Sequence, residues 1–262
     1  MTEVHLPDQV HPHSQPFVRQ HAVLLFSGLT FVLTIAVILL PLPVMVAPAL
    51  VVFIPTLIAV LLITLTDGWH AVRKALFSAR AWRIGIKWLL ISLAAALALR
   101  VFTSLFALAL GYPFQPQGFT PFLIVTFLFA AGEEIGWRGY ALPLAMKRYS
   151  PLGAAVLLGI PWAALHAPLT LPGKMLAGVP VAALLLTMLA LSILVNWVYI
   201  ASGRSLLAPV LLHGGQNLFV FLNNGVPVEP VNWSMTAVYL AAALLVILLT
   251  RGRLQARASS AL

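Results

Sequence analysis

Apolar residues form long uninterrupted stretches along this chain, and polar residues gather in the short connections between them. A helix needs about 20 consecutive apolar residues to cross a hydrocarbon core of about 30 Å. The apolar-polar alternation of a membrane β-barrel is absent. The pattern therefore predicts an all-α, polytopic integral membrane bundle of about eight transmembrane helices, over Ala22–Leu40, Ala47–Thr66, Ile84–Leu110, Thr120–Met146, Leu152–Leu169, Val181–Ala201, Ser205–Leu222 and Met235–Thr250.

Basic residues are distributed unevenly over the predicted connections. With eight spans the two termini share one side of the membrane with the loops after spans two, four and six. That side holds 12 of the 15 Lys and Arg residues, and the opposite side holds only Lys174. Such a bias marks the cytoplasmic side. We therefore expect both termini to be cytoplasmic in a cell-membrane protein, and we interpret the net charge of +9 as a topology signal rather than a nucleic-acid-binding surface.

The chain is predicted to have a single membrane domain over residues 21–250, with its chemistry confined to about 121–222. A disordered cytoplasmic tail is expected over 1–20 and a basic cytoplasmic tail over 251–262. The first 20 residues lack the basic start of a secretory signal. There is no cysteine, which excludes disulfides and thiol chemistry.

Two adjacent glutamates, Glu133 and Glu134, lie within the fourth predicted span. A charged side chain near the bilayer centre costs at least roughly 2.5–3.5 kcal/mol, so each carboxylate needs a partner or a function. Successive helical residues lie about 100° apart, and residues four apart share a face. We therefore expect Glu134 to pair with Arg138 and Glu133 to point towards another helix. The alternative is that both glutamates are neutralised, by Arg138 and by Arg100 of the third span.

Other polar residues lie within the fifth and seventh spans. His166 follows Trp162 by four residues, and His213 precedes Asn217 by four, which places the latter two on one helical face. Singly, each of these residues could equally make a helix-helix hydrogen bond. Together, a carboxylate, two imidazoles and an amide can activate a water molecule and stabilise an oxyanion. The combination predicts hydrolysis of an acyl bond, most plausibly a peptide bond.

These motifs resemble the three-motif signature of the CAAX prenyl endopeptidase and bacteriocin-processing family of intramembrane proteases, also called CPBP or Abi proteins. The resemblance covers about Pro121–Leu222 and rests on three motifs in the same order: Glu133-Glu134-x-x-x-Arg138, an aromatic residue four before His166, and His213-x-x-x-Asn217. One departure is Trp162, because the second motif usually has phenylalanine at this position.

The resemblance implies that Glu133 activates water with help from His166, and that His213 and Asn217 position the water or stabilise the oxyanion. Glu134 and Arg138 would support them. Glu133, His166 and His213 could bind Zn²⁺ with one open position. No His-Glu-x-x-His motif is present, and a metal-free mechanism fits the same residues.

The predicted function is therefore an intramembrane endopeptidase that acts on a membrane-associated or lipidated peptide or protein. Its expected partners are that substrate and the lipid bilayer, with no nucleic acid, and the sequence specifies no oligomeric state. A second hypothesis is a non-catalytic membrane protein that binds a peptide, such as a bacteriocin-immunity protein. A third is a proton-coupled transporter, although the internal repeat typical of many transporters is absent.

Overall fold

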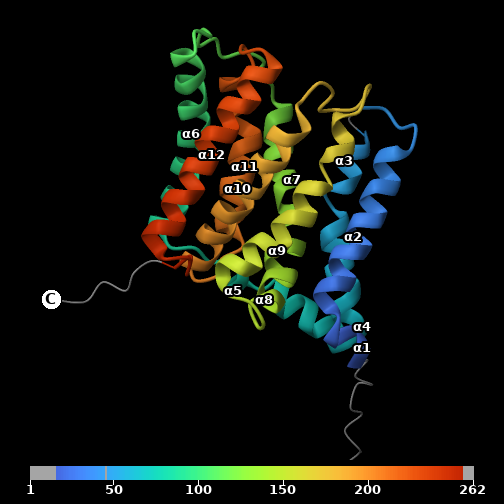
Figure 1. Ribbon diagram of the computed structural model, residues 1–262. Coiled ribbons are helices and arrows are strands. Elements are labelled where there is room, and N and C mark those ends of the chain that lie inside the picture. The colour runs from blue at the N-terminus through green and yellow to red at the C-terminus, as the bar shows by residue number, and fades with distance from the viewer. Residues whose placement is uncertain (1–15, 45, 256–262) are drawn as a thin grey trace, which may run out of the picture.

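The computed structural model describes residues 16–44 and 46–255, and within them the chain is helical with no strand (Figure 1). The elements are α1 (Pro16–Gln20), α2 (Ala22–Leu39), α3 (Val46–Val51), α4 (Ile54–Leu76), α5 (Ala79–Trp82), α6 (Ile86–Ala109), α7 (Phe122–Gly136), η1 (Trp137–Ala141), α8 (Leu142–Ala145), α9 (Pro151–Ala164), η2 (Ala167–Thr170), α10 (Val181–Ala201), α11 (Leu207–Leu218), η3 (Phe219–Leu222) and α12 (Val228–Thr250). The prediction of an all-α polytopic membrane bundle is confirmed.

Six of the predicted spans coincide with helical segments that are long and apolar enough to cross a membrane. The other two also coincide with helices. The fourth corresponds to α7, η1 and α8 in succession, and the seventh to a shorter apolar segment, Leu207–Leu222. The total of eight spans stays a prediction.

Two helices extend well beyond their predicted spans. The second span was expected to end at Thr66, but α4 continues to Leu76 across a kink at Gly68, whose φ of 78° suits glycine. The eighth was expected to begin at Met235, but α12 begins at Val228, directly after a proline. Both extensions carry polar residues that a hydropathy pattern excludes from a span.

The two ends of the described chain lie at the same end of the bundle, together with α5 and α8 (Figure 1). Basic residues follow this arrangement. Arg19 of α1 pairs with Asp67 of α4 at 2.8 Å, and Arg148 donates a hydrogen bond to the Gln20 carbonyl. Their cytoplasmic orientation stays a prediction. Of the predicted tails, residues 16–20 are helical, while 1–15 and 256–262 lie outside the described residues.

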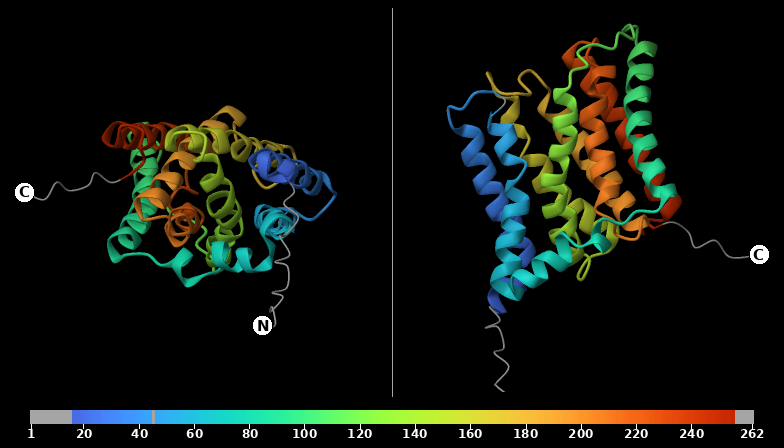
Figure 2. Two further views of the ribbon diagram at one scale, coloured as in Figure 1. Left: turned by 90° about the horizontal axis from the view of Figure 1, so that it is seen from below. Right: turned by 180° about the vertical axis from the view of Figure 1, so that it is seen from behind.

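Helix α7 lies in the middle of the bundle when the molecule is seen along its length (Figure 2). Its glycines allow α4 to approach closely. A Cβ on Gly136 would lie 2.4 Å from the Pro55 backbone carbon, and one on Gly132 would lie 2.8 Å from the Val52 oxygen. The Thr56 hydroxyl also donates to the Gly132 carbonyl at 2.6 Å. The small-xxx-small pair therefore fixes the helix that carries both glutamates against α4.

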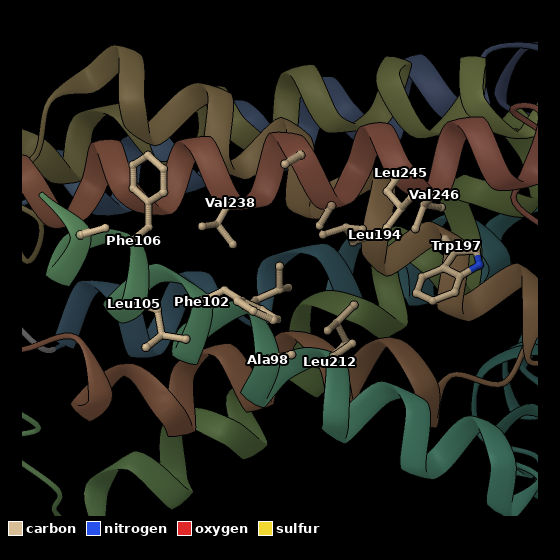
Figure 3. A pocket seen from close by; sticks show the side chains of 15 residues that line it. Ala98, Phe102, Leu105, Phe106, Leu194, Trp197, Leu212, Val238, Leu245 and Val246 are labelled. Carbon is tan, nitrogen blue, oxygen red and sulfur yellow. The ribbon is translucent and has the colours of Figure 1, made fainter. Parts of the chain in front are cut away.

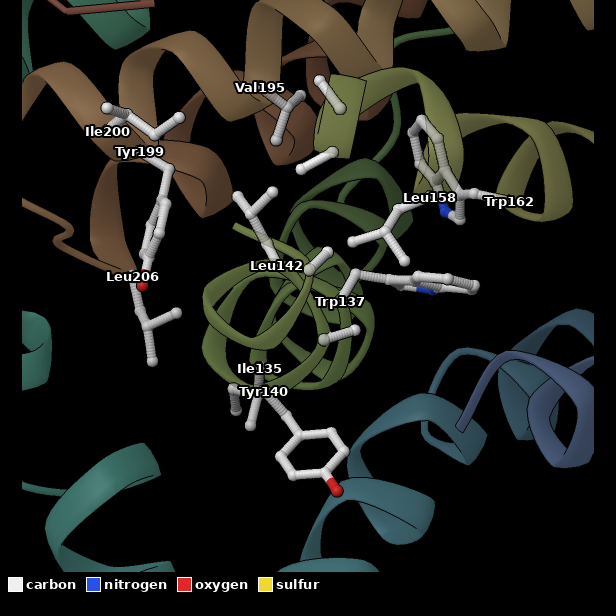
Figure 4. Close-up of a cluster of buried hydrophobic side chains, with 14 of the residues drawn as sticks. Ile135, Trp137, Tyr140, Leu142, Leu158, Trp162, Val195, Tyr199, Ile200 and Leu206 are labelled. Atoms are coloured by element: carbon white, nitrogen blue, oxygen red, sulfur yellow. The ribbon is translucent and has the colours of Figure 1, made fainter. Parts of the chain in front are cut away.

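A π-helical turn, η1, follows the glutamates immediately. The Leu142 N–H donates to the Trp137 carbonyl, five residues back. Pro143, just beyond, has no N–H to give to a carbonyl in the preceding turn, and a widened turn accommodates this loss. Around it, Trp137 and Leu142 pack with Leu158 and Trp162 of α9 in one hydrophobic cluster (Figure 4). This cluster places α9 beside the polar end of α7.

Candidate active site

Glu134 and Arg138 form a buried ion pair on one face of the α7–η1 helix. Arg138 Nη1 donates to Glu134 Oε1 at 3.0 Å, and the two side chains are 3% and 0% exposed. Arg138 also donates to α10, through Nε to Asn196 Oδ1 at 3.1 Å and through Nη2 to Ser192 Oγ at 3.4 Å. The expected pairing at i, i+4 is therefore present, and the arginine also ties α7 to α10.

His213 of α11 is a second partner of Glu134. Its Nδ1 lies 2.8 Å from Glu134 Oε1, the same oxygen that Arg138 contacts. Because a carboxylate oxygen accepts, Nδ1 carries the hydrogen and Nε2 faces elsewhere. Glu134 Oε2 is buried without a hydrogen-bond partner among the described residues. We call Glu134, Arg138 and His213 the Glu134 cluster. It joins α7 to α11 through Glu134 and His213, which are 79 residues apart in the sequence.

Glu133 lies outside this cluster, as its position one residue earlier on the helix predicts. Its Oε2 accepts a hydrogen bond of 2.7 Å from Trp162 Nε1 of α9. The side chain is partly exposed, whereas Glu134 is fully buried. The two adjacent carboxylates therefore have different partners: Glu134 is paired with charged or chargeable groups, and Glu133 with a neutral indole.

His166 lies just beyond the end of α9, in the turn that leads into η2. Its backbone N–H bonds to the Ala163 carbonyl, which leaves the Trp162 carbonyl without its usual partner four residues on. The His166 ring fills this role, with Nδ1 2.8 Å from the Trp162 oxygen. A carbonyl only accepts, so Nδ1 is the protonated nitrogen and Nε2 has a free lone pair in the neutral ring.

Trp162 contacts both histidines. Its ring meets those of His166 and His213 edge-on, with centroid separations of 5.5 Å and 5.4 Å. The guanidinium carbon of Arg138 lies 4.8 Å from the same ring centroid. The two histidines, Glu133 and the Glu134 cluster are therefore gathered around one buried indole.

Asn217 lies one turn beyond His213 on α11, and its Nδ2 donates to the Thr126 carbonyl of α7 at 3.1 Å. An amide nitrogen carries two hydrogens, so one remains for another acceptor. The glycines between these residues permit close helix approach. A Cβ on Gly214 would lie 2.6 Å from the Phe127 oxygen of α7, and one on Gly215 would lie 2.5 Å from Ala96 Cβ of α6.

Arg100 of α6 does not neutralise either glutamate. Its Nε and Nη2 donate to the Gln216 carbonyl at 3.1 Å and 2.8 Å, and its Nη1 donates to Asn223 Oδ1. The Tyr239 hydroxyl donates to the Gln216 side chain. The two acceptors of Arg100, on Gln216 and Asn223, belong to the C-terminal end of α11 and the turn after it. A cation there interacts favourably with the helix dipole. Neutralisation of Glu133 by Arg100 is therefore not what the structure contains.

Within residues 16–44 and 46–255 no three or more His, Asp or Glu side chains are grouped so that they could share a metal ion. Glu133, His166 and His213 are therefore not grouped in this way, and a Zn²⁺ site at these residues stays a prediction. The hydrogen bonds of His213 Nδ1 with Glu134 and of Glu133 Oε2 with Trp162 leave His213 Nε2 and Glu133 Oε1 for other partners.

An apolar pocket of about 670 Å³ is formed between α6, α10, α11 and α12 (Figure 3). Phe102 and Leu105 of α6 and Val238 of α12 line it, and Leu212 of α11 is the lining residue next to His213 in the sequence. None of the polar site residues lines this pocket. Two adjacent residues of α11 therefore face different environments: Leu212 lines the apolar pocket, and His213 contacts Glu134.

Sequence reasoning found the polar residues but missed some of the contacts between them. The helical period predicted the Glu134–Arg138 pair. The sequence does not predict that Trp162 donates to Glu133, because the motif identifies this position only as aromatic. Ser192 could have been found from its spacing of four from Asn196, which puts both on one face of α10.

Comparison with known proteins agrees with the resemblance noted from the motifs. Residues 115–219 match the model of the family described as type II CAAX prenyl endopeptidase Rce1-like. The chain is also 29% identical over 113 residues to CAAX prenyl protease 2 of Methanococcus maripaludis, a match that spans 39% of this chain and 40% of that protein. The matched segment of this chain, residues 115–219, contains all six candidate site residues: Glu133, Glu134, Arg138, His166, His213 and Asn217. Over residues 115–219, which are less than half of the chain, the protein is therefore similar to the Rce1-like family of CAAX prenyl endopeptidases.

Proposed function

We propose that this protein is an intramembrane endopeptidase in which Glu133 is the general base. The observation that carries the proposal is the difference between the two adjacent glutamates. Glu134 is fully buried and shared by Arg138 and His213, whereas Glu133 is partly exposed and holds a single neutral donor on Oε2. Glu133 Oε1 accepts no hydrogen bond from any described residue, so it has lone pairs for a water molecule.

In the proposed reaction, Glu133 takes a proton from water as the water oxygen attacks the carbonyl carbon of the peptide. His166, whose Nε2 has a free lone pair, helps to hold this water. When the tetrahedral intermediate collapses, the carbon–nitrogen bond breaks and the protonated Glu133 returns its proton to the leaving amine. The products are a carboxylic acid and an amine, which ionise to a carboxylate and an ammonium group, and Glu133 is again ionised.

The negative oxygen of the tetrahedral intermediate would be stabilised by His213 and Asn217. Asn217 has one N–H left after its bond to the Thr126 carbonyl. His213 donates from Nε2 when it is an imidazolium, held by Glu134 through Nδ1. In that form Glu133, Glu134, Arg138 and His213 carry no net charge together, which suits a site surrounded by apolar helices.

The proposed substrate is a membrane-associated or lipidated peptide or protein. The site lies within apolar helices rather than at a soluble domain, so a substrate reaches it from the membrane or its boundary. The name of the relative, a CAAX prenyl protease, supports the lipidated class. Since the match covers two fifths of that relative, substrate choice is part of the proposal.

The test is cleavage of a peptide library, with and without prenylated C-terminal cysteine, by purified detergent-solubilised protein. We expect wild type to cleave, and Glu133→Gln and His166→Ala to lose at least about 100-fold in kcat, as removal of a positioned acid-base group does. Glu229→Gln is the matched control, because Glu229 is an exposed acid in the first turn of α12. We expect cleavage to persist with a zinc chelator; loss of cleavage that added Zn²⁺ restores would contradict a metal-free mechanism.

The rival hypotheses predict different results in the same experiment. A peptide-binding protein would retain substrate peptides without cleaving them, and Glu133→Gln would leave that retention intact. A proton-coupled transporter would neither cleave nor retain them. Wild type that is folded, as judged by a cooperative melt, but cleaves no peptide in the library would therefore count against the proposal.

A further inference from the structure

Trp162 is the side chain that contacts most members of the site, although its residue type is a departure from the motif it belongs to. It is 1% exposed, and its Nε1 donates a 2.7 Å hydrogen bond to Glu133 Oε2. A hydrogen bond to an ionised carboxylate is stronger than one between neutral groups. A phenylalanine, which the family motif usually has here, cannot donate such a bond.

We infer that Trp162 is a positioning residue for Glu133: its indole N–H fixes one carboxylate oxygen and thereby presents the other to the attacking water. A glutamate side chain has three rotatable bonds. Without a fixed partner, rotation about the last of them would exchange the positions of Oε1 and Oε2. The bond at Oε2 removes that freedom. The inference rests on the proposed function, because it assigns Glu133 the role of base.

The indole can do this because it is itself held on several sides. The Arg138 guanidinium lies over its face at 4.8 Å, and the rings of His166 and His213 meet it edge-on. Its own carbonyl accepts from His166 Nδ1. A donor fixed in this way retains its direction, so the position of Glu133 is linked to the same groups that surround Glu134.

The hydrogen bond can be tested without any catalytic assay. The chain has seven tryptophans, so protein with 15N-labelled tryptophan gives seven indole N–H resonances. The one lost in Trp162→Phe belongs to Trp162. In Glu133→Gln, where a neutral amide replaces the carboxylate, we expect this resonance to shift upfield while that of Trp137 stays in place. A Trp162 resonance that does not move in Glu133→Gln would overturn the inference.

The positioning role is tested by kinetics. We expect Trp162→Phe to lower kcat about tenfold, equivalent to about 1.4 kcal/mol, with KM unchanged. Trp137→Phe is the matched control, because Trp137 is also 1% exposed but its Nε1 has no hydrogen-bond partner in the part of the chain that the structure describes. It loses the same atoms from a buried indole, and we expect its kcat to equal that of wild type.

The outcomes separate this inference from the proposed function. If wild type cleaves and Trp162→Phe has an unchanged or higher kcat, the positioning role is wrong while the protease stands. If both tryptophan variants lose activity equally, the effect of Trp162 is one of packing and the inference is again wrong. If wild type cleaves nothing but the resonance of Trp162 shifts in Glu133→Gln, the hydrogen bond stands and the proposed function, with the role built on it, fails.

Discussion

Arg138→Met is the change that tests most directly what holds the site together. The Arg138 and Glu134 side chains are 3% and 0% exposed, so solvent screens their 3.0 Å contact very little. Methionine keeps much of the side-chain volume but removes the charge. Glu134 then retains only His213, and Asn196 and Ser192 lose a donor. Removal of one member of a buried ion pair destabilises proteins by about 3–5 kcal/mol, because the other charge stays buried.

The assay is thermal unfolding of the detergent-solubilised protein. For chains of about this size a loss of 1 kcal/mol lowers Tm by about 2–4 °C, so Arg138→Met should lower Tm by about 6–20 °C. Arg73→Met is the matched control, because Arg73 is exposed at the end of α4 and should change stability by no more than about 0.5 kcal/mol.

A second variant identifies the cause of the loss. In Glu134→Gln/Arg138→Met both charges of the pair are absent, while the glutamine oxygen can still accept from His213 Nδ1. We expect the double variant to melt above Arg138→Met, since no uncompensated carboxylate remains. The reasoning would be refuted if Arg138→Met melted within about 2 °C of wild type, or if the double variant were as unstable as the sum of the two single changes.

Two further predictions concern the helix contacts around the site. Gly136→Ala places a Cβ 2.4 Å from the Pro55 backbone and should lower stability by about 1–3 kcal/mol. The control is Gly28→Ala, at a helical position with open space, which should leave the melting temperature unchanged or raise it. Equal effects of the two changes would contradict the close packing of α4 and α7. Arg100→Met leaves the amide oxygen of Asn223, a 3% exposed residue, without its arginine donor and should cost about 1–3 kcal/mol, and an unchanged melt would show that this network does not stabilise the end of α11.

The sequence predicted the helices well because a membrane makes their composition distinctive. Apolar runs located the spans, and the i, i+4 rule identified the partner of Glu134. The prediction of helix ends from apolar runs failed where polar residues extend a helix, as after the kink at Gly68 and before Met235. Hydropathy defines the part of a helix that is apolar, which is shorter than the part that is hydrogen-bonded.

Contacts between spans were the least predictable part of the site. His213 was identified as a site residue, but its bond to Glu134 depends on how α11 packs against α7. That packing is governed by close approaches such as the one at Gly214, which sequence spacing alone does not orient. The bond from Trp162 to Glu133 depends similarly on the packing of α9 beside α7. Periodicity orders residues around one helix, whereas their partners on other helices follow from packing.

The difference between the two glutamates follows from a register of one residue. Glu134 has Arg138 four positions later, and the two pair within the bundle. Glu133 has Trp137 at the same spacing, and an indole cannot neutralise a carboxylate. A cation at position 137 would form an ion pair with Glu133, and a paired carboxylate is a weaker base. Trp162 instead supplies one neutral donor, which fixes one carboxylate oxygen without neutralising the charge. The register of one arginine therefore gives Glu134 a buried charged partner and leaves Glu133 available for the role of base that we propose.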